Sequence, residues 1–126
     1  MPGAQILVVE DNEKNMRLFR DVLQAAGYLT LEATTGGRAV ELAIEHGPDL
    51  ALMDIQLPDI DGVETLGRLR ADERTASIPV LALTAQAMEG DRERFLAAGF
   101  DGYLSKPVDI ADLVATVKQH CEGGGR

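Results

Sequence analysis

The chain has 126 residues, of which 45% are hydrophobic, so it can form one domain with a sizeable core and is not expected to be disordered. Its formal charge of −9 argues against direct binding of nucleic acid, which requires Lys and Arg at phosphates, and suits a metal cation or a basic partner surface. The single cysteine, Cys121, excludes an intrachain disulfide and a Cys-rich zinc site.

Short apolar runs alternate with amphipathic stretches along the whole chain. The runs predict strands at residues 5–10, 28–33, 50–54, 80–84 and 102–105. Apolar residues at three- and four-residue spacing predict a helix after each strand, at residues 16–26, 39–43, 63–69, about 88–98 and 110–117. Gly27, Gly47 and Gly99 are expected at helix ends, and Asp109 is the expected N-cap of the last helix.

Five strand–helix repeats predict an α/β fold, a parallel five-stranded sheet with helices on both faces. Right-handed crossovers favour the flavodoxin-like order 2-1-3-4-5, a (βα)5 three-layer sandwich. We expect one domain over residues 4–121 and a disordered tail over residues 122–126.

No apolar stretch approaches the ~20 residues that cross a bilayer, and acidic residues follow the first apolar run at once, unlike in a signal peptide. We therefore expect a cytoplasmic protein. Met1 favours a free-standing chain over one excised from a longer protein.

Polar side chains end four of the five predicted strands. Glu10 and Asp11 follow the first strand, Asp54 the third, Thr84 the fourth and Lys106 the fifth. The second strand, an edge strand in the predicted order, ends without a charged group. Because ligands of open parallel sheets bind outside the carboxyl ends of the strands, these residues are expected to form one site.

The three carboxylates of Glu10, Asp11 and Asp54 indicate a cation site. Like charges at such close range repel each other, and a set of oxygen ligands beside a phosphate favours Mg²⁺. Taken alone, Glu10 and Asp11 are equally consistent with the acidic first turn of a solvated helix.

Thr84 and Lys106 supply a hydroxyl and an ammonium, which suit an anion. Together with Asp54 they are typical of a site for a phosphoryl group. Taken singly, Lys106 is consistent with a surface lysine or a counter-ion, and Thr84 with the N-cap of the fourth helix.

At these positions the chain resembles the receiver domain of two-component response regulators. The matching residues are 9–12 (VEDN), 53–54 (MD), 57–58 (LP), 61–62 (DG), 83–85 (LTA) and 103–107 (YLSKP). They span about residues 4–121, in the order that the family has, and single-domain members are the closest in kind.

The resemblance implies a role for each position of the site. Asp54 is expected to accept a phosphoryl group from a phosphohistidine. Mg²⁺ is expected to bind Asp11, Asp54 and the backbone carbonyl of Gln56, with Glu10 acting through water. Thr84 and Lys106 are expected to bind the phosphoryl oxygens.

The resemblance also implies how the signal is read. Tyr103 would be the aromatic switch residue that turns inward when Thr84 moves, although on composition alone it is a half-buried strand aromatic. Gln56 and Gln86 stand at two variable positions that flank the pocket.

The partners implied are a sensor histidine kinase or a histidine phosphotransfer protein, and a downstream protein on the surface of the fourth helix, fifth strand and fifth helix. The chain is expected to be a monomer or weak dimer that binds neither nucleic acid nor membrane. It would catalyse its own phosphorylation and dephosphorylation without turning over a separate substrate.

Other functions fit the sequence less well. A haloacid-dehalogenase-like phosphatase needs a second Asp where Gln56 stands, and a flavodoxin-like cofactor binder needs a phosphate loop where the acidic residues 10–13 lie. A pseudo-receiver that acts without phosphorylation is the main alternative, against which the intact acidic set, Thr84 and Lys106 argue.

Two further patterns do not indicate a binding site. The EF-hand register of residues 57–68 puts Leu57 at the first ligand position and Arg68 at the last, which excludes a calcium loop. Gly36 and Gly37 are interpreted as easing entry into the second helix.

Overall fold

The computed structural model describes residues 3–85 and 91–123. The strands are β1 (Gln5–Val9), β2 (Leu29–Ala33), β3 (Leu50–Asp54), β4 (Val80–Thr84) and β5 (Gly102–Ser105). The helices are α1 (Glu13–Ala25), α2 (Gly36–His46), α3 (Gly62–Ala71), α4 (Asp91–Ala98) and α5 (Ile110–Lys118), followed by a π-helical turn, η1 (Gln119–Gly123).

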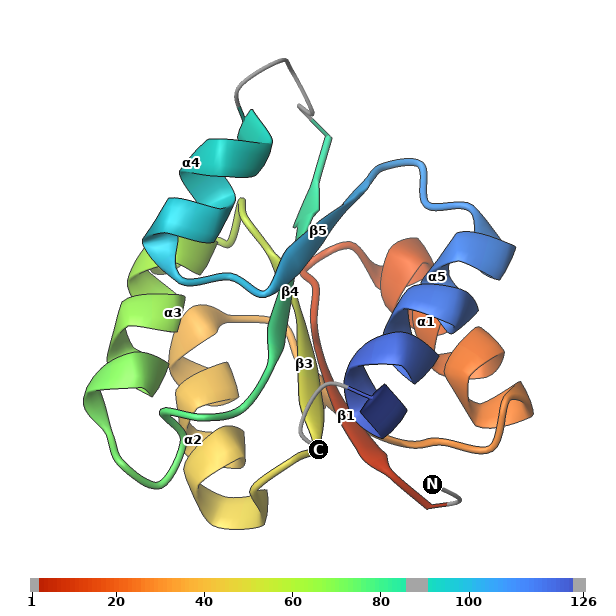
Figure 1. Ribbon diagram of the computed structural model, residues 1–126, viewed down its shortest axis with the longest axis horizontal. Coiled ribbons are helices and arrows are strands. Elements are labelled where there is room, and N and C mark those ends of the chain that lie inside the picture. Colours follow the sequence, from red (N-terminus) through yellow and green to blue (C-terminus); the bar gives the residue numbers. More distant parts are fainter. Residues whose placement is uncertain (1–2, 86–90, 124–126) are drawn as a thin grey trace.

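The sheet is parallel throughout, with the strand order β2-β1-β3-β4-β5, which confirms the predicted flavodoxin-like topology. Helices α1 and α5 cover one face, and α2, α3 and α4 cover the other (Figure 1). The carboxyl ends of the four strands β1, β3, β4 and β5 therefore lie side by side at one edge of the sheet.

The two cores follow from the alternation of side chains along the strands. In β1, Ile6 and Val8 pack beneath α1 and α5, whereas Leu7 and Val9 pack beneath α2 and α3. Every residue of β3 and β4 is buried, because helices cover both faces of these central strands.

Side chains that cap the helices fix where most of them begin. Asn12, Thr35, Asp61 and Asp109 each accept a hydrogen bond from the backbone N–H three residues ahead. Asp109 is thus confirmed as the N-cap of α5.

The observed boundaries differ little from the predicted ones. β1 ends at Val9, so Glu10 follows the strand instead of belonging to it. Residues 88–90 of the predicted fourth helix, and residues 124–126 of the predicted tail, lie outside the described residues. No helix in the described part of the chain has both the length and the apolar character needed to span a membrane.

Candidate phosphoryl-acceptor site

The strand ends bring the predicted site residues to one pocket of about 280 Å³. Its lining includes Glu10, Asp11, Asp54, Gln56, Thr84 and Lys106. Asp54 is the last residue of β3 and Thr84 the last of β4, and the adjacent strands hold these ends in register. The parallel register of the sheet therefore assembles the site from residues far apart in the chain.

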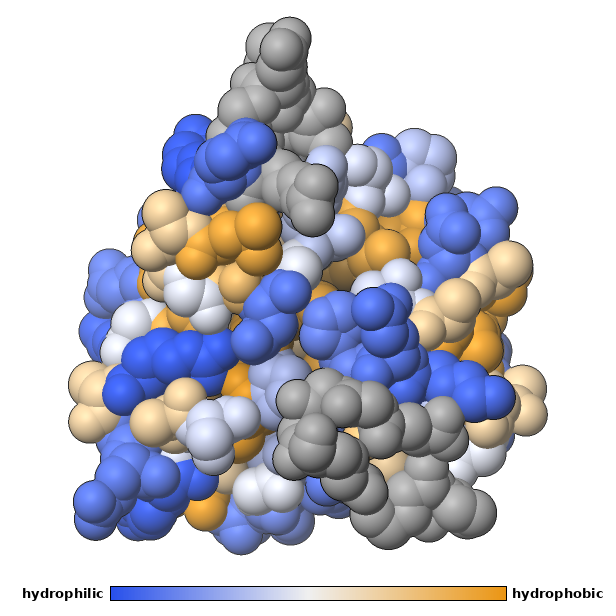
Figure 2. All heavy atoms as spheres, in the orientation of Figure 1, coloured by the Kyte–Doolittle hydropathy of each residue, from blue (hydrophilic) through white to orange (hydrophobic). Residues whose placement is uncertain are grey.

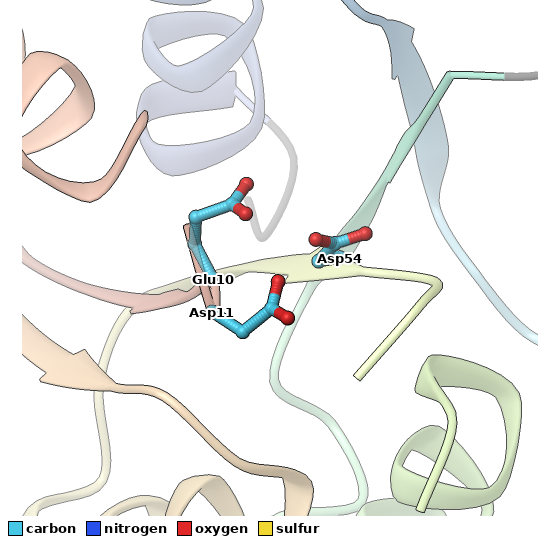
Figure 3. A group of neighbouring side chains, drawn as sticks. All are labelled: Glu10, Asp11 and Asp54. Carbon is cyan, nitrogen blue, oxygen red and sulfur yellow. The ribbon is translucent and has the colours of Figure 1, made fainter. Parts of the chain in front are cut away.

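Three carboxylates converge at the centre of the pocket. One oxygen from each of Glu10, Asp11 and Asp54 lies within 4.8 Å of the others, and the three side chains point toward one another (Figure 3). Glu10 and Asp54 are buried, at 0% and 5% exposure, whereas Asp11 is exposed. The burial of Glu10 before α1 begins rules out its placement in the first turn of a solvated helix.

Lys106 lies between two of these carboxylates. Its Nζ is 2.7 Å from Glu10 Oε1 and 3.0 Å from Asp54 Oδ2. The backbone N–H of Lys106 donates to the carbonyl of Thr84 at 2.7 Å, which ties Lys106 to the end of β4. The Lys106–Pro107 peptide bond is cis. Lys106 therefore acts as a counter-ion, and its side chain is only 18% exposed.

The electrostatics of the pocket follow from burial and pairing. Burial raises the pKa of Glu10, against the hydrogen bonds from Lys106 and from the Asn12 N–H, which lower it. Burial would lower the pKa of Lys106, but hydrogen bonds to Glu10 and Asp54 outweigh it and raise that pKa. Lys106 is therefore firmly cationic in the folded protein.

The donor set fits a divalent cation. All three acidic side chains offer oxygen atoms, and three carboxylates against one ammonium leave two formal negative charges. Mg²⁺ and similar hard cations take such oxygen ligands. The orientation of the Asp54 carboxylate is fixed in part by the Gln56 N–H, which donates to its Oδ1 at 3.0 Å.

Tyr103 lies apart from this pocket. It is half-buried in β5 and packs against Phe95, with ring centroids 6.1 Å apart. Together with Leu104, Ser105, Pro107 and Asp109 it lines a neighbouring surface groove. The structure thus brings six of the seven predicted site residues into one pocket and places Tyr103 beside it. The flanking position Gln86 lies outside the described residues.

The sequence assigned no role to six other described residues that line the pocket: Asn12, Asn15, Ile55, Ala85, Arg94 and Phe95. Asn12 could have been found, since an Asn directly before a helical pattern is a typical N-cap. Nothing local distinguishes Arg94 from the other charged residues of α4.

The chain is similar to known proteins over nearly its whole length. The sequence model of the response regulator receiver domain matches residues 6–118. The polar-differentiation response regulator DivK of Brucella ovis is 48% identical over 115 residues, which are 91% of this chain and 94% of that protein. DivK of Brucella anthropi is 47% identical over 120 residues, which are 95% and 97% of the two chains.

Solved structures agree with this similarity. The receiver domain of sensor histidine kinase PA1611 from Pseudomonas aeruginosa, which has a magnesium ion coordinated in its active site cleft, superimposes with a TM-score of 0.86 at 38% identity, over 93% of this chain and 96% of that one. The chemotaxis response regulator CheY4 of Vibrio cholerae gives a TM-score of 0.87 at 26% identity, over 93% and 98%.

Proposed function

Because the chain belongs to the response regulator receiver domain family, and is therefore a signalling module of two-component systems, we propose that Asp54 is its phosphoacceptor. The observation that carries the proposal is the environment of the Asp54 carboxylate. It is buried at the end of β3, flanked by Glu10 and Asp11, and paired with Lys106.

Mg²⁺ belongs to this proposal as the cofactor. Asp11, Asp54 and the backbone carbonyl of Gln56 would bind it directly, and Glu10 would act through a bound water. The two formal charges that Lys106 leaves unbalanced support a divalent ion, as does the magnesium ion in the related cleft of PA1611. When bound, the ion neutralises charge on the phosphoryl oxygens during transfer.

The nucleophile is a carboxylate oxygen of Asp54, which forms a bond to phosphorus as the bond between phosphorus and the donor's imidazole nitrogen breaks. The electron pair of that bond stays on the imidazole, and the product is an acyl phosphate. Little covalent work falls to the protein, so catalysis depends on position and charge. The Gln56 N–H and Lys106 Nζ hold the carboxylate from two sides for this purpose.

Lys106 and Thr84 bind the transferred group in this mechanism. The Lys106 ammonium, already 3.0 Å from Asp54, would pair with a phosphoryl oxygen, and the Thr84 hydroxyl would donate to another. The phosphoryl group itself carries about −1.5 to −2 charges at neutral pH, which would draw both groups inward. Since Thr84 ends β4, its movement would shift the end of this strand.

The face formed by α4, β5 and α5 is the proposed readout surface, with Tyr103 as its switch residue. Tyr103 packs on Phe95 of α4 and is therefore placed to respond when that helix moves. In Figure 2, hydrophobic side chains reach this face over α4 and beside the segment that links β5 to α5. If phosphorylation shifted the free-energy difference between two conformations of this surface by ~1.4 kcal/mol, the ratio of their populations would change tenfold.

The proposal includes the partners and setting expected from the sequence. The donor is a sensor histidine kinase or a histidine phosphotransfer protein, and a downstream protein binds the readout surface. The chain would act as a monomer or weak dimer in the cytoplasm, where kinases draw on ATP. The receiver domain would span residues 4–121.

The test is to incubate the protein with acetyl phosphate or phosphoramidate and Mg²⁺ and to measure its mass. We expect one phosphoryl adduct that is lost in Asp54→Asn and in EDTA. Asp72→Asn is the matched control, because it removes an acidic residue beyond the far end of α3 and should keep the adduct. An equal adduct in Asp54→Asn would contradict the assignment.

A further inference from the structure

The loop between β3 and α3, residues 55–61, carries Gln56 along one wall of the pocket. Its two ends are fastened to the core. At the start, the Ile55 N–H donates to the Leu83 carbonyl at 3.1 Å, and at the end the Gly62 N–H donates to the Ile55 carbonyl at 2.8 Å. Gln56 leaves this base as an exposed residue.

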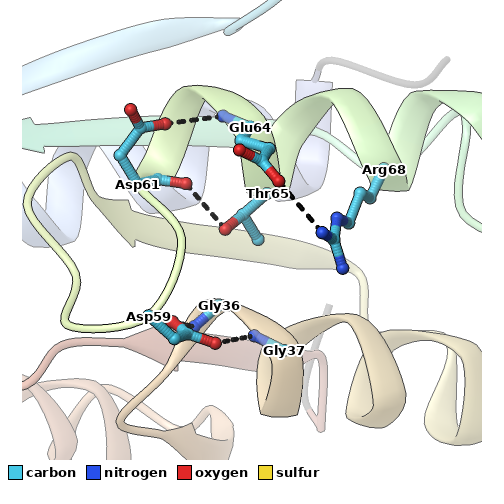
Figure 4. Close-up of polar contacts among 7 residues, drawn as sticks. All are labelled: Gly36, Gly37, Asp59, Asp61, Glu64, Thr65 and Arg68. Atoms are coloured by element: carbon cyan, nitrogen blue, oxygen red, sulfur yellow. Dashed lines mark hydrogen bonds and ion pairs between the residues drawn. The ribbon is translucent and has the colours of Figure 1, made fainter.

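Asp59 fastens the middle of the loop to a different element. Its Oδ1 accepts from the Gly36 N–H at 2.8 Å and its Oδ2 from the Gly37 N–H at 2.9 Å, the first two residues of α2 (Figure 4). The N–H groups of Gly37, Ile60 and Gly36 lower the pKa of Asp59 to about 2, so the carboxylate is charged wherever the protein functions. Within the described residues, no other hydrogen bond ties residues 57–60 to another element.

The contact is close because α2 begins with glycine. A Cβ on Gly36 would overlap Thr65 Oγ1 and lie 2.5 Å from Ile60 Cγ1, so no larger residue fits between the loop and α3. α2 already has its own N-cap, since Thr35 Oγ1 accepts from the Arg38 N–H at 3.1 Å. Asp59 therefore takes the two N–H groups that Thr35 leaves, from 23 and 22 residues away in the sequence.

We propose that Asp59 is a positioning residue for the metal site. By clamping the loop to α2, it holds the backbone of Gln56 at the pocket wall, where the carbonyl is ready to bind Mg²⁺. This inference rests on the proposed function, because it takes the pocket of Asp54 to be a magnesium site. Asp59 itself touches neither the ion nor the phosphoryl group.

The experiment measures the dissociation constant of Mg²⁺ by isothermal titration calorimetry at fixed ionic strength, with the free energy of unfolding measured in EDTA. Asp59→Ala removes both clamp contacts. We expect its Mg²⁺ affinity to fall about tenfold, the lower end of the cost of removing a group that orients a metal ligand.

Two further variants separate the clamp from other effects. Thr35→Ala weakens the start of α2 without touching the loop, so it should lower stability and leave Mg²⁺ affinity unchanged. Asp59→Asn removes the same charge as Asp59→Ala but keeps one acceptor, so its affinity should lie between those of the wild type and Asp59→Ala. If Asp59→Ala does not fold, the comparison of Asp59→Asn with Thr35→Ala decides.

Three results would overturn the inference alone: wild-type affinity in both Asp59 variants, equal loss of affinity in Thr35→Ala, or identical loss in Asp59→Asn and Asp59→Ala, which would be an effect of charge. A wild-type protein that binds no Mg²⁺ would instead overturn the metal site of the proposed function, and this inference with it.

Discussion

Lys106 compensates two buried carboxylates that would otherwise repel each other. It pairs with Glu10, which is fully buried, and with Asp54, which is 5% exposed. Removing one partner of a buried ion pair leaves the other charge without compensation, and this usually destabilises more than forming the pair stabilised.

We therefore predict that Lys106→Met lowers the free energy of unfolding in EDTA at neutral pH by on the order of 3 kcal/mol. Mg²⁺ should then stabilise the variant more than the wild type, because three uncompensated carboxylates face the ion instead of two. Thermal unfolding in EDTA and in Mg²⁺ measures both effects. Lys118→Met, at an exposed position of α5, is the control and should change neither quantity. Equal responses of Lys106→Met and wild type to Mg²⁺ would contradict this account.

At the level of elements, α3 begins in direct contact with the backbone of Asp54. A Cβ on Gly62 would lie 2.5 Å from the carbonyl oxygen of Asp54 and 2.9 Å from Ile55 Cα. These are backbone atoms at the end of a central strand, so they cannot move aside as a flexible side chain would. The loop that follows Asp54 returns this closely only because Gly62 lacks a side chain.

The same helix offers a matched control for this contact. Gly67 lies in the middle of α3, and a Cβ there would meet no atom within 4 Å. We predict that Gly62→Ala destabilises the protein by about 2–3 kcal/mol through overpacking, whereas Gly67→Ala stabilises it by about 1 kcal/mol through helix propensity. Urea denaturation measures both. If Gly62→Ala stabilised the protein as Gly67→Ala does, helix propensity, and not the contact with Asp54, would govern position 62.

The strands, their order and five of the pocket residues could be predicted because each rests on a local pattern, whereas the sixth, Gln56, follows only from the resemblance to receiver domains. Apolar runs mark the strands, and the polar residue after each run marks its carboxyl end. The contact of Asp59 with Gly36 and Gly37 could not be predicted. It joins the loop of residues 55–61 to the start of α2, and no spacing in the sequence records the path that brings them together.

Across the whole molecule, the carboxyl ends and the amino ends of the parallel strands have different roles. The carboxyl ends of the strands hold the charged pocket, where like charges are brought together. At the amino ends of the strands, Arg70 joins the segments that precede β4 and β5. Its guanidinium donates to the carbonyls of Ala76, Ile78 and Gly99 at 2.6–3.1 Å and pairs with Asp101 at 3.0 Å.

We therefore expect stability and function to depend on different ends of the strands. We predict that Arg70→Met lowers the free energy of unfolding by about 2–3 kcal/mol, because several carbonyls and the Asp101 carboxylate lose a charged donor. Its dissociation constant for Mg²⁺ should stay at the wild-type value, since the pocket lies at the other end of β4. Arg68→Met, which breaks an exposed pair with Glu64 on the same helix, should cost less than about 0.5 kcal/mol. Urea denaturation and calorimetric titration give the two quantities. A loss of Mg²⁺ affinity in folded Arg70→Met would mean that the amino ends of the strands also set the geometry of the pocket.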